Sequence, residues 1–324
     1  MSSDPQMFGP SQLMGQPVSE ALEVLNELDP ERLLAESEVE LYCSMTAELS
    51  VFEQPSAQML TTVHDTELTT DHPDVDLPGV VLEDFLGGGG QGWVYLGKVR
   101  ETGKIVAVKI FRRDSKGAQA AAAREFNVCC RVRHPNLVRI FRSQAAGRFW
   151  VVIMELIRGE ELGQVALEPE ELWSCCHSVA DALIAMHDHD LVHCDVKPAN
   201  ILLRSRDHSP VLVDFGLVQD LQHPQPAKGI SGTPYFMAPE MFRSDFAHPS
   251  WDAYSLGVTA AVLLVGKLEQ FSDLNSLHLA KVSGYFDSVL LEGLRTLEHE
   301  QLRDWCQSLL DREPSQRVKA LREM

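Results

Sequence analysis

His193-Cys194-Asp195-Val196-Lys197-Pro198-Ala199-Asn200 is followed, after thirteen intervening residues, by Asp214-Phe215-Gly216. The intervening residues begin with the apolar run Ile201-Leu202-Leu203 and end with the apolar run Val211-Leu212-Val213, and a polar segment separates the two. Such a pattern is typical of two strands joined by a hairpin turn. The sequence therefore predicts a short ribbon that connects the two motifs.

The predicted hairpin would bring four polar side chains to one edge of the ribbon: Asp195, Lys197, Asn200 and Asp214. Two carboxylates, an amide oxygen and an ammonium group suit a polyphosphate with divalent cations, because hard cations prefer oxygen ligands. Each of these residues, taken alone, is equally well explained as an ordinary polar loop residue. The complete set, in this order and spacing, favours a phosphate-handling site.

Charge is distributed unevenly along the chain of 324 residues, whose formal net charge is −19. Residues 1–80 contain sixteen acidic residues against one basic residue, Arg32, so the rest of the chain carries only −4. This balance argues against generic binding to nucleic acid or to anionic lipid. An apolar fraction of 44% is normal for a globular protein with a sizeable core. We expect a globular body preceded by an acidic segment.

Cysteine usage and hydropathy indicate a cytoplasmic protein. The seven cysteines are odd in number and form no C-x-x-C motif, so neither a disulfide framework nor a zinc site is expected. The chain shows no basic-then-apolar N-terminal signal. Its most apolar run, Val258 to Val265, is too short to span a bilayer.

A glycine-rich segment lies between two runs that resemble strands, Val80 to Leu86 and Tyr95 to Lys98. Glycine permits a tight chain reversal and a close approach of the backbone to phosphate oxygens. Placement between strands favours a β-hairpin over a nucleotide and argues against a dinucleotide fold, in which a helix follows the last glycine. A plain glycine linker is the alternative. The motif G-x-G-x-x-G-x-V is matched at Gly87, Gly89, Gly92 and Val94.

A single lysine interrupts the apolar strand predicted for Ile105 to Ile110. Burial of Lys109 would be costly without a partner of opposite charge. The alternative is that its side chain reaches the edge of the sheet. The next periodic stretch, about Gln119 to Val132, predicts a helix that contains Glu125.

Taken together, these motifs resemble the protein kinases, whose pattern is His-Arg-Asp-x-x-x-x-Asn followed by Asp-Phe-Gly. The stretch Gly232 to Glu240, which ends in Ala-Pro-Glu, resembles the end of a kinase activation segment. The resemblance covers about residues 79–320 and implies an α+β, bilobal fold. It further implies an N-lobe at 79–156 with a β-rich structure and one helix, and a mainly helical C-lobe at 157–320, after an acidic extension at 1–78.

The resemblance assigns a role to each residue of the predicted phosphate site. Asp195 would act as the base toward a substrate hydroxyl, and Lys197 would neutralise the transferring phosphoryl group. Asn200 and Asp214 would hold Mg²⁺. Lys109 would hold the α- and β-phosphates of ATP and pair with Glu125.

The same resemblance implies an ATP site in which Met154 lies at the back of the pocket and the segment after it hydrogen-bonds the adenine. Taken alone, Met154 is equally well explained as a core residue. Glu240 would form an ion pair with Arg317. The implied nucleotide-binding residues are Leu86, Gly87, Gly89, Gly92, Val94, Ala107, Lys109, Glu125, Met154, Glu155 and Ile157.

Lys197 followed by Pro198 resembles the serine/threonine kinases, and Thr233 before Ala-Pro-Glu agrees with that specificity. The implied activity is ATP-dependent phosphorylation of serine or threonine in a protein substrate. A pseudokinase scaffold is a weaker alternative, because Lys109, Asp195 and Asp214 are all present. A small-molecule phosphotransferase is another, which the stretch Gly232 to Glu240 argues against.

Cys194 departs from the family pattern, which usually has arginine at this position. In many kinases that arginine pairs with a phosphate on the activation loop, and cysteine cannot make this bidentate contact. We therefore hypothesise that activity does not depend on activation-loop phosphorylation in the usual way, although Ser231 and Thr233 supply hydroxyl groups there. For the extension at 1–78, autoinhibition, docking to the kinase domain, autophosphorylation and a passive solvated tail all stay open.

Overall fold

The structure of the chain, a computed structural model, forms two compact units. Residues 54–224 belong to one unit and residues 225–324 to the other. Nearly all of the acidic extension, Ser231 and half of the predicted helix at 119–132 lie outside the residues that can be described. The structure describes residues 75, 77–89, 92–112, 122, 124–126, 128, 131–147, 149–224, 232–244, 246–266 and 270–323.

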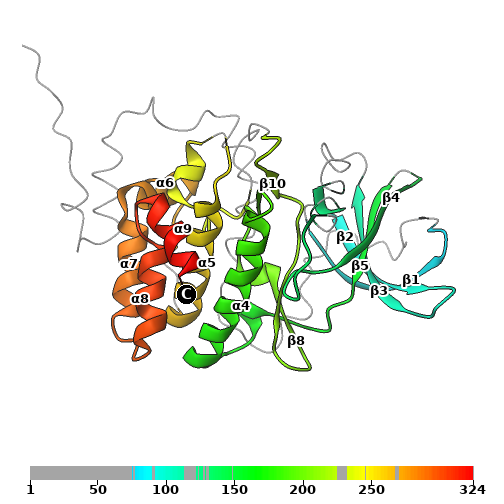
Figure 1. Cartoon of the computed structure of the whole chain (residues 1–324), viewed down its shortest axis with the longest axis horizontal. Coiled ribbons are helices and arrows are strands. Elements are labelled where there is room, and N and C mark those ends of the chain that lie inside the picture. Colours follow the sequence, from blue (N-terminus) through cyan, green and yellow to red (C-terminus); the bar gives the residue numbers. More distant parts are fainter. Residues whose placement is uncertain are drawn as a thin grey trace, which may run out of the picture. The chain divides into compact units, whose positions relative to one another are not determined.

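The first unit begins with an antiparallel sheet in the order β1-β2-β3-β5-β4 (Figure 1). Two of its antiparallel strand pairs, β1–β2 and β4–β5, are joined by short connections, as expected for hairpins. The strand bounds are β1 Val80–Gly89, β2 Gly92–Val99, β3 Ile105–Arg112, β4 Ile140–Ala146 and β5 Phe149–Glu155.

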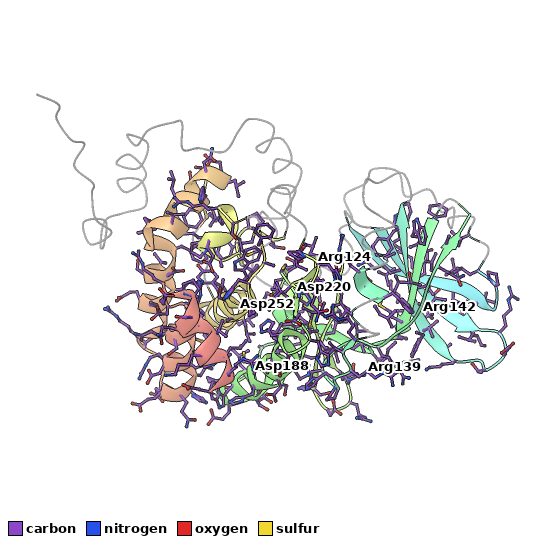
Figure 2. All side chains as sticks on the ribbon, turned by 45° about the horizontal axis from the view of Figure 1, so that its top comes forward. Arg124, Arg139, Arg142, Asp188, Asp220 and Asp252 are labelled. Carbon is purple, nitrogen blue, oxygen red and sulfur yellow. The ribbon has the colours of Figure 1, made fainter. Side chains whose placement is uncertain are left out.

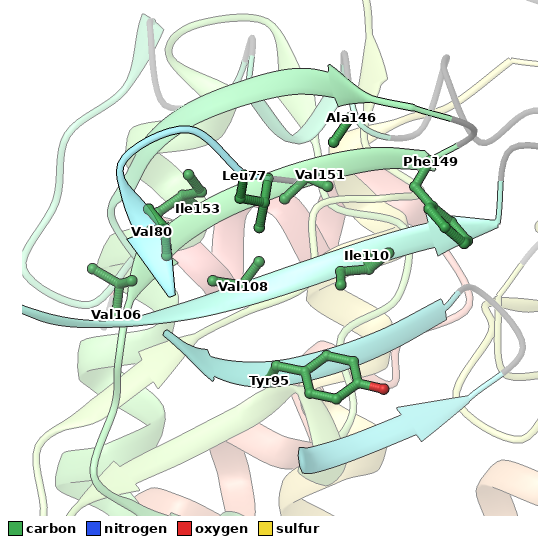
Figure 3. Packing of buried hydrophobic residues seen from close by; sticks show 10 residues of the cluster. All are labelled: Leu77, Val80, Tyr95, Val106, Val108, Ile110, Ala146, Phe149, Val151 and Ile153. Atoms are coloured by element: carbon green, nitrogen blue, oxygen red, sulfur yellow. The ribbon is translucent and has the colours of Figure 1, made fainter. Parts of the chain in front are cut away.

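One face of this sheet forms a hydrophobic core, and the alternation of side chains along β3 shows why (Figure 3). Val106, Val108 and Ile110 are almost fully buried in the core. Since successive side chains of a strand point to opposite faces, Ala107 and Lys109 face away from this cluster. The other core members are Leu77, Val80, Tyr95, Ala146, Phe149, Val151 and Ile153.

The apolar run from Leu137 to Phe141 predicts a strand, but the strand β4 begins only at Ile140. Leu137 instead forms an isolated parallel bridge with Leu212. The Val138 N–H also donates to the Leu212 carbonyl at 3.0 Å. This difference ties the segment before β4 to the ribbon that precedes Asp214.

The rest of the first unit contains a long helix, α4 (Pro169–His187), a small three-stranded sheet and a separate strand pair. α4 begins with a capping box between Glu168 and Glu171, which satisfies free N–H groups of the first turn. The hairpin predicted between the two opening motifs is confirmed by antiparallel pairing of β8 with β9. These short strands are β6 Gly159–Glu161, β7 Leu191–Val192, β8 Ile201–Arg204, β9 Pro210–Leu212 and β10 Gln219–Asp220.

The second unit is helical in its described residues, and α5 packs against α7, α8 and α9 (Figure 1). The sequence predicts a helix from Tyr254 to Leu268, but α5 begins earlier, at Pro249, where the His248 side chain accepts from the Ser250 N–H and caps the first turn. It ends at Val265, and the cap residue Gly266 has a left-handed φ of 67°, which favours glycine. The helices are α5 Pro249–Val265, α6 Leu274–Ser283, α7 Tyr285–Leu294, α8 Glu300–Leu309 and α9 Pro314–Arg322.

A β-sheet followed by a helical part confirms the predicted α+β fold class. The implied ion pair between Glu240 and Arg317 is present in the second unit, and Ser250 Oγ also donates to Glu240 at 3.1 Å. None of the helices in the described part of the chain is long and apolar enough to cross a membrane.

Candidate active site

The Lys109 side chain joins two carboxylates in the first unit. Its Nζ lies 2.6 Å from Glu125 Oε1 and 2.8 Å from Asp214 Oδ1. Lys109 is 7% exposed and Glu125 is 1% exposed. The predicted pairing of Lys109 with Glu125 is therefore confirmed, and the alternative of a lysine that reaches the sheet edge is wrong. The same ammonium group also connects to the aspartate of the Asp-Phe-Gly motif.

The pKa values in this cluster follow from burial and from its charges. Burial lowers the pKa of Lys109, but the charges of Glu125 and Asp214 outweigh it, so the pKa lies above the ordinary lysine value. Burial raises the pKa of Glu125 to about 7, against the opposing charge of Lys109. The two shifts are compatible because the fully ionised cluster carries a net charge of −1. Glu125 is therefore the carboxylate that takes up a proton first.

Asp214 is held by its own backbone as well as by Lys109. Its φ of 63° is left-handed, an uncommon conformation for a residue with a side chain. The Gly216 N–H donates to Asp214 Oδ1 at 3.2 Å. Burial acts to raise the pKa of Asp214, but Lys109 and this N–H group lower it below the usual value. Asp214 is therefore ionised at neutral pH, as a metal ligand requires.

Asp195 lies within a compact hydrogen-bonded group made by the loop from His193 to Asn200. Asn200 Nδ2 donates to Asp195 Oδ2 at 2.9 Å and to the Asp195 carbonyl at 2.8 Å. Lys197 Nζ lies 3.2 Å from the same Oδ2. The structure thus brings together the catalytic residues predicted for this loop.

His193 and Cys194 form the buried scaffold of that loop. His193 Nδ1 accepts from the Asp195 N–H at 3.3 Å, and its Nε2 lies 3.2 Å from the Val213 carbonyl. The histidine therefore bridges the loop to the residue before Asp214. Cys194 has a left-handed φ of 67°, and its thiol contacts the Val192 carbonyl at 3.5 Å. The buried thiol therefore contacts the strand β7 that precedes the loop.

The strand register aligns the predicted nucleotide-binding residues of the sheet. Val94 pairs with Gly87 of β1 and with Lys109 of β3. Ala107 pairs with Met154 of β5. Gly92 is required by a close approach, because a Cβ there would lie 2.2 Å from the Ile110 carbonyl oxygen. These positions therefore share one surface, on the side of β3 that carries Lys109.

The strand register described above does not include the other predicted nucleotide-binding residues. Leu86 is an exposed residue of β1, and Ile157 is half-buried after β5. The Glu155 carboxylate pairs with Arg204 at 2.8 Å, and the Glu155 N–H donates to the Arg139 carbonyl at 2.8 Å. Gly89 ends β1. Their contacts with a nucleotide stay a prediction.

The donor set around Asp214 fits Mg²⁺. Asn200 uses its amide nitrogen toward Asp195, which leaves its amide oxygen as the candidate metal ligand. The Val213 N–H donates to the Asn200 carbonyl at 2.9 Å and holds Asn200 beside Asp214 in the chain path. Mg²⁺ is usually bound by one or two protein oxygens together with phosphates. Within the described residues, no cluster of three His, Cys, Asp or Glu side chains suitable for a metal is found.

Sequence reasoning missed Arg124, Arg131 and Asp220, which lie next to the predicted residues. Arg124 Nε donates to the Gly216 carbonyl at 2.9 Å. Arg131 Nη1 lies 2.7 Å from Asp220 Oδ2. These residues belong to no recognisable motif. The sequence offered only their proximity in the chain to Glu125 and to Asp214.

Comparison with known proteins gives the same assignment. The family model for the protein kinase domain matches residues 80–323. The chain belongs to the protein kinase family. It is 33% identical to the serine/threonine-protein kinase pkn2 of Myxococcus xanthus over 199 residues, which are 56% of this chain and 24% of that protein.

Further relatives of this kinase-family chain include animal proteins. It is 29% identical to the serine/threonine-protein kinase PAK 4 of Mus musculus over 75% of this chain and 42% of that protein. It is 28% identical to myosin light chain kinase 3 of Rattus norvegicus over 82% and 34%. The chain thus matches less than half the length of each of these relatives. The predicted family is confirmed.

Proposed function

We propose that this chain phosphorylates serine or threonine residues of proteins with ATP and Mg²⁺. The contact of Lys109 with both Glu125 and Asp214 is the observation that supports this most directly. Such a contact joins a group suited to phosphate with the candidate metal ligand, and it requires two distant parts of the chain to be in place. Similarity to relatives named serine/threonine-protein kinases supports the hydroxyl specificity.

In this proposal, Asp195 orients the acceptor hydroxyl and takes its proton. Lys197, 3.2 Å from the Asp195 carboxylate, is available to neutralise charge on the transferring phosphoryl group. Lys109 holds the α- and β-phosphates. Asn200 and Asp214 would hold Mg²⁺, which neutralises charge on the phosphates when it is bound.

The nucleotide is proposed to lie on the surface shared by Gly92, Val94, Ala107 and Met154. Small and apolar side chains suit a flat base, and Ala107 paired with Met154 supplies them. The backbone after Met154 would hydrogen-bond the base. Residues 79–320 would form the kinase domain, and the boundary between its lobes would follow Leu156.

A transfer assay tests the proposal. Purified chain is incubated with γ-labelled ATP, Mg²⁺ and a generic protein acceptor, and phosphoamino-acid analysis identifies the product. We expect phosphoserine or phosphothreonine from the wild type and none from Asp195→Asn. Asp207→Asn, at an exposed position of the β8–β9 turn, is the matched control and should transfer normally.

The outcomes separate the alternatives. Binding of Mg·ATP without transfer would favour a pseudokinase scaffold, and transfer to small molecules but not to protein would favour the other alternative. The absence of both transfer and Mg·ATP binding would refute the enzymatic proposal.

For the extension at 1–78, the same assay on a chain that begins at residue 79 tests the proposed regulatory contact. A higher rate means inhibition, a lower rate means docking or support of folding, and no change means a passive tail. We also propose a cytoplasmic location, which fluorescence microscopy of a tagged chain would test.

A further inference from the structure

The helix that contains Glu125 is tied to the segment after Asp214 by arginine side chains. Residues 124–126, 128 and 131 are helical in the described structure, and we call this element the Glu125 helix. Arg124 Nε donates to the Gly216 carbonyl at 2.9 Å, and Arg131 Nη1 lies 2.7 Å from Asp220 Oδ2. Figure 2 labels Arg124 and Asp220 in this region. The Glu125 helix therefore contacts this segment through two of its residues, Arg124 and Arg131.

Asp220 lies at the centre of several contacts that fix its carboxylate. As part of β10, Asp220 pairs with Leu191 of β7. Its Oδ1 accepts from the Gln222 N–H at 3.0 Å, and its Oδ2 lies 3.2 Å from His223 Nδ1. Burial acts to raise the pKa of Asp220, but the bonds from Arg131, His223 and Gln222 lower it. The carboxylate is thus charged at neutral pH and held in one position.

Arg131 is likewise held by more than one group. Besides Asp220, its guanidinium donates to the carbonyl of His189, which lies two residues after α4. The side chains of Arg131 and Asp220 are 22% and 20% exposed, so solvent screens this pair less than a surface pair. The Arg206–Asp207 pair, with Arg206 86% exposed, is an example of the screened kind.

Each residue of the Arg131–Asp220 pair lies a short distance along the chain from a carboxylate that contacts Lys109. Arg131 follows Glu125 by six residues, which is less than two turns of helix. Asp220 follows Asp214 by the same number of residues. The ion pair therefore connects the element that carries Glu125 to the segment that follows Asp214, which β10 anchors by pairing with β7.

We propose that Arg131 is a positioning residue, which through its ion pair with Asp220 aligns Glu125 and Asp214 around Lys109 without a phosphate on the chain. This inference rests on the proposed kinase function. In it, Asp220 supplies a permanent negative charge, which agrees with Cys194 at the position where the family usually has a phosphate-binding arginine. The activation segment then needs no phosphate to place Asp214.

Kinetics of dephosphorylated protein test the proposal. The full chain is co-expressed with a phosphatase, and intact mass confirms that no phosphate is attached. We expect the dephosphorylated wild type to transfer phosphate. Arg131→Gln and Asp220→Asn should each lower kcat by about tenfold, a size typical of coupled neighbours, with the KM for the protein acceptor changed less than about twofold.

The variants also distinguish positioning from folding. The double variant should be no slower than either single variant, and Arg131→Lys, which keeps the charge, should recover part of kcat. Arg206→Gln is the matched control, since it removes the same charge from an exposed pair. Circular dichroism checks that each variant is folded.

Each failure points to a different conclusion. If wild-type protein transfers no phosphate in any phosphorylation state, the proposed function fails. If dephosphorylated wild type is inactive and gains activity on phosphorylation, or if Arg131→Gln and Asp220→Asn match the Arg206→Gln control, the function stands and the positioning role is refuted.

Discussion

Two buried lysines, Lys109 in the first unit and Lys281 in the second, have opposite electrostatic settings. Lys109 Nζ is within 2.8 Å of both Glu125 and Asp214, and its pKa is raised. Lys281 is 1% exposed, and its Nζ lies 3.3 Å from the Tyr254 hydroxyl and 3.8 Å from the centre of the Phe286 ring. Burial lowers the pKa of Lys281 to about 7, although Asp287 and Glu240 oppose that shift.

The difference shows that direct carboxylate contact, rather than burial, decides whether a buried lysine keeps its charge. At Lys281 the nearby Asp287 is engaged elsewhere, because the Tyr254 hydroxyl donates to Asp287 Oδ1 at 2.5 Å. Lys281 instead lies against aromatic rings, which attract a cation more weakly than a carboxylate does. A permanently charged lysine suits a phosphate site, whereas one near neutrality suits the interior of a helical unit.

The largest expected effect is on phosphate transfer. Lys109→Met should lower kcat/KM by at least about 100-fold, because it removes a fixed positive charge from a buried phosphate site. Lys281→Met, the matched replacement of the other buried lysine, should change transfer less than about twofold when both proteins are folded. Equal losses in the two variants, measured with labelled ATP, would break the functional distinction between the lysines.

A smaller effect is expected on the free energy of unfolding of the chain at alkaline pH, through the titration of Lys281. The pKa of Lys281 is about 7 in the folded chain, against 10.5 for the ordinary group. The unfolded chain therefore binds more protons between these values, so this group makes the free energy of unfolding rise with pH above 7. We expect an increase on the order of 2 kcal/mol between pH 7 and pH 9, since one pKa unit corresponds to about 1.4 kcal/mol.

Urea unfolding of the wild type and of Lys281→Met at these pH values measures this contribution. The variant has no titrating group at position 281, so its stability should lack the rise. A rise of the same size in both proteins would show that Lys281 stays protonated, as Lys109 does.

The smallest expected effect concerns Glu125 and has the opposite sign. Its pKa is raised from 4.5 to about 7, so the folded chain binds more protons in that window. The contribution of this group to stability is complete below pH 4.5 and is lost as the pH rises to 7. We expect a loss of about 1 kcal/mol between pH 5.5 and pH 7, because Lys109 limits the repulsion.

The comparison of wild type with Glu125→Gln, again by urea unfolding and without nucleotide, isolates this term. Glutamine cannot titrate, so the variant should lose less stability than the wild type over the same interval. If the two proteins follow parallel curves, Glu125 is ionised throughout and the cluster keeps its full negative charge.

Much of the candidate site was predictable because its motifs are local. Asp195, Lys197 and Asn200 lie in one short loop, and the apolar runs after them predicted the β8–β9 hairpin that the structure confirms. The pairing of Lys109 with Glu125 was predictable from the resemblance to the protein kinases, because both residues lie at positions that match the family's pattern. Strand starts were less predictable, as at Leu137, because a tertiary bridge to Leu212 replaces the expected strand pairing.

The sequence alone determined which chemical groups this protein has for phosphate transfer and their order, because those groups lie in motifs whose spacing depends on local backbone geometry. Only the tertiary structure decided which charged groups form ion pairs with one another. Asp214 reaches Lys109 across 105 positions of the chain, and the Arg131–Asp220 pair follows no motif. The surroundings of the Lys281 ammonium group were also not predictable, because a lysine in a helix sequence does not reveal whether a carboxylate or an aromatic ring will lie beside it.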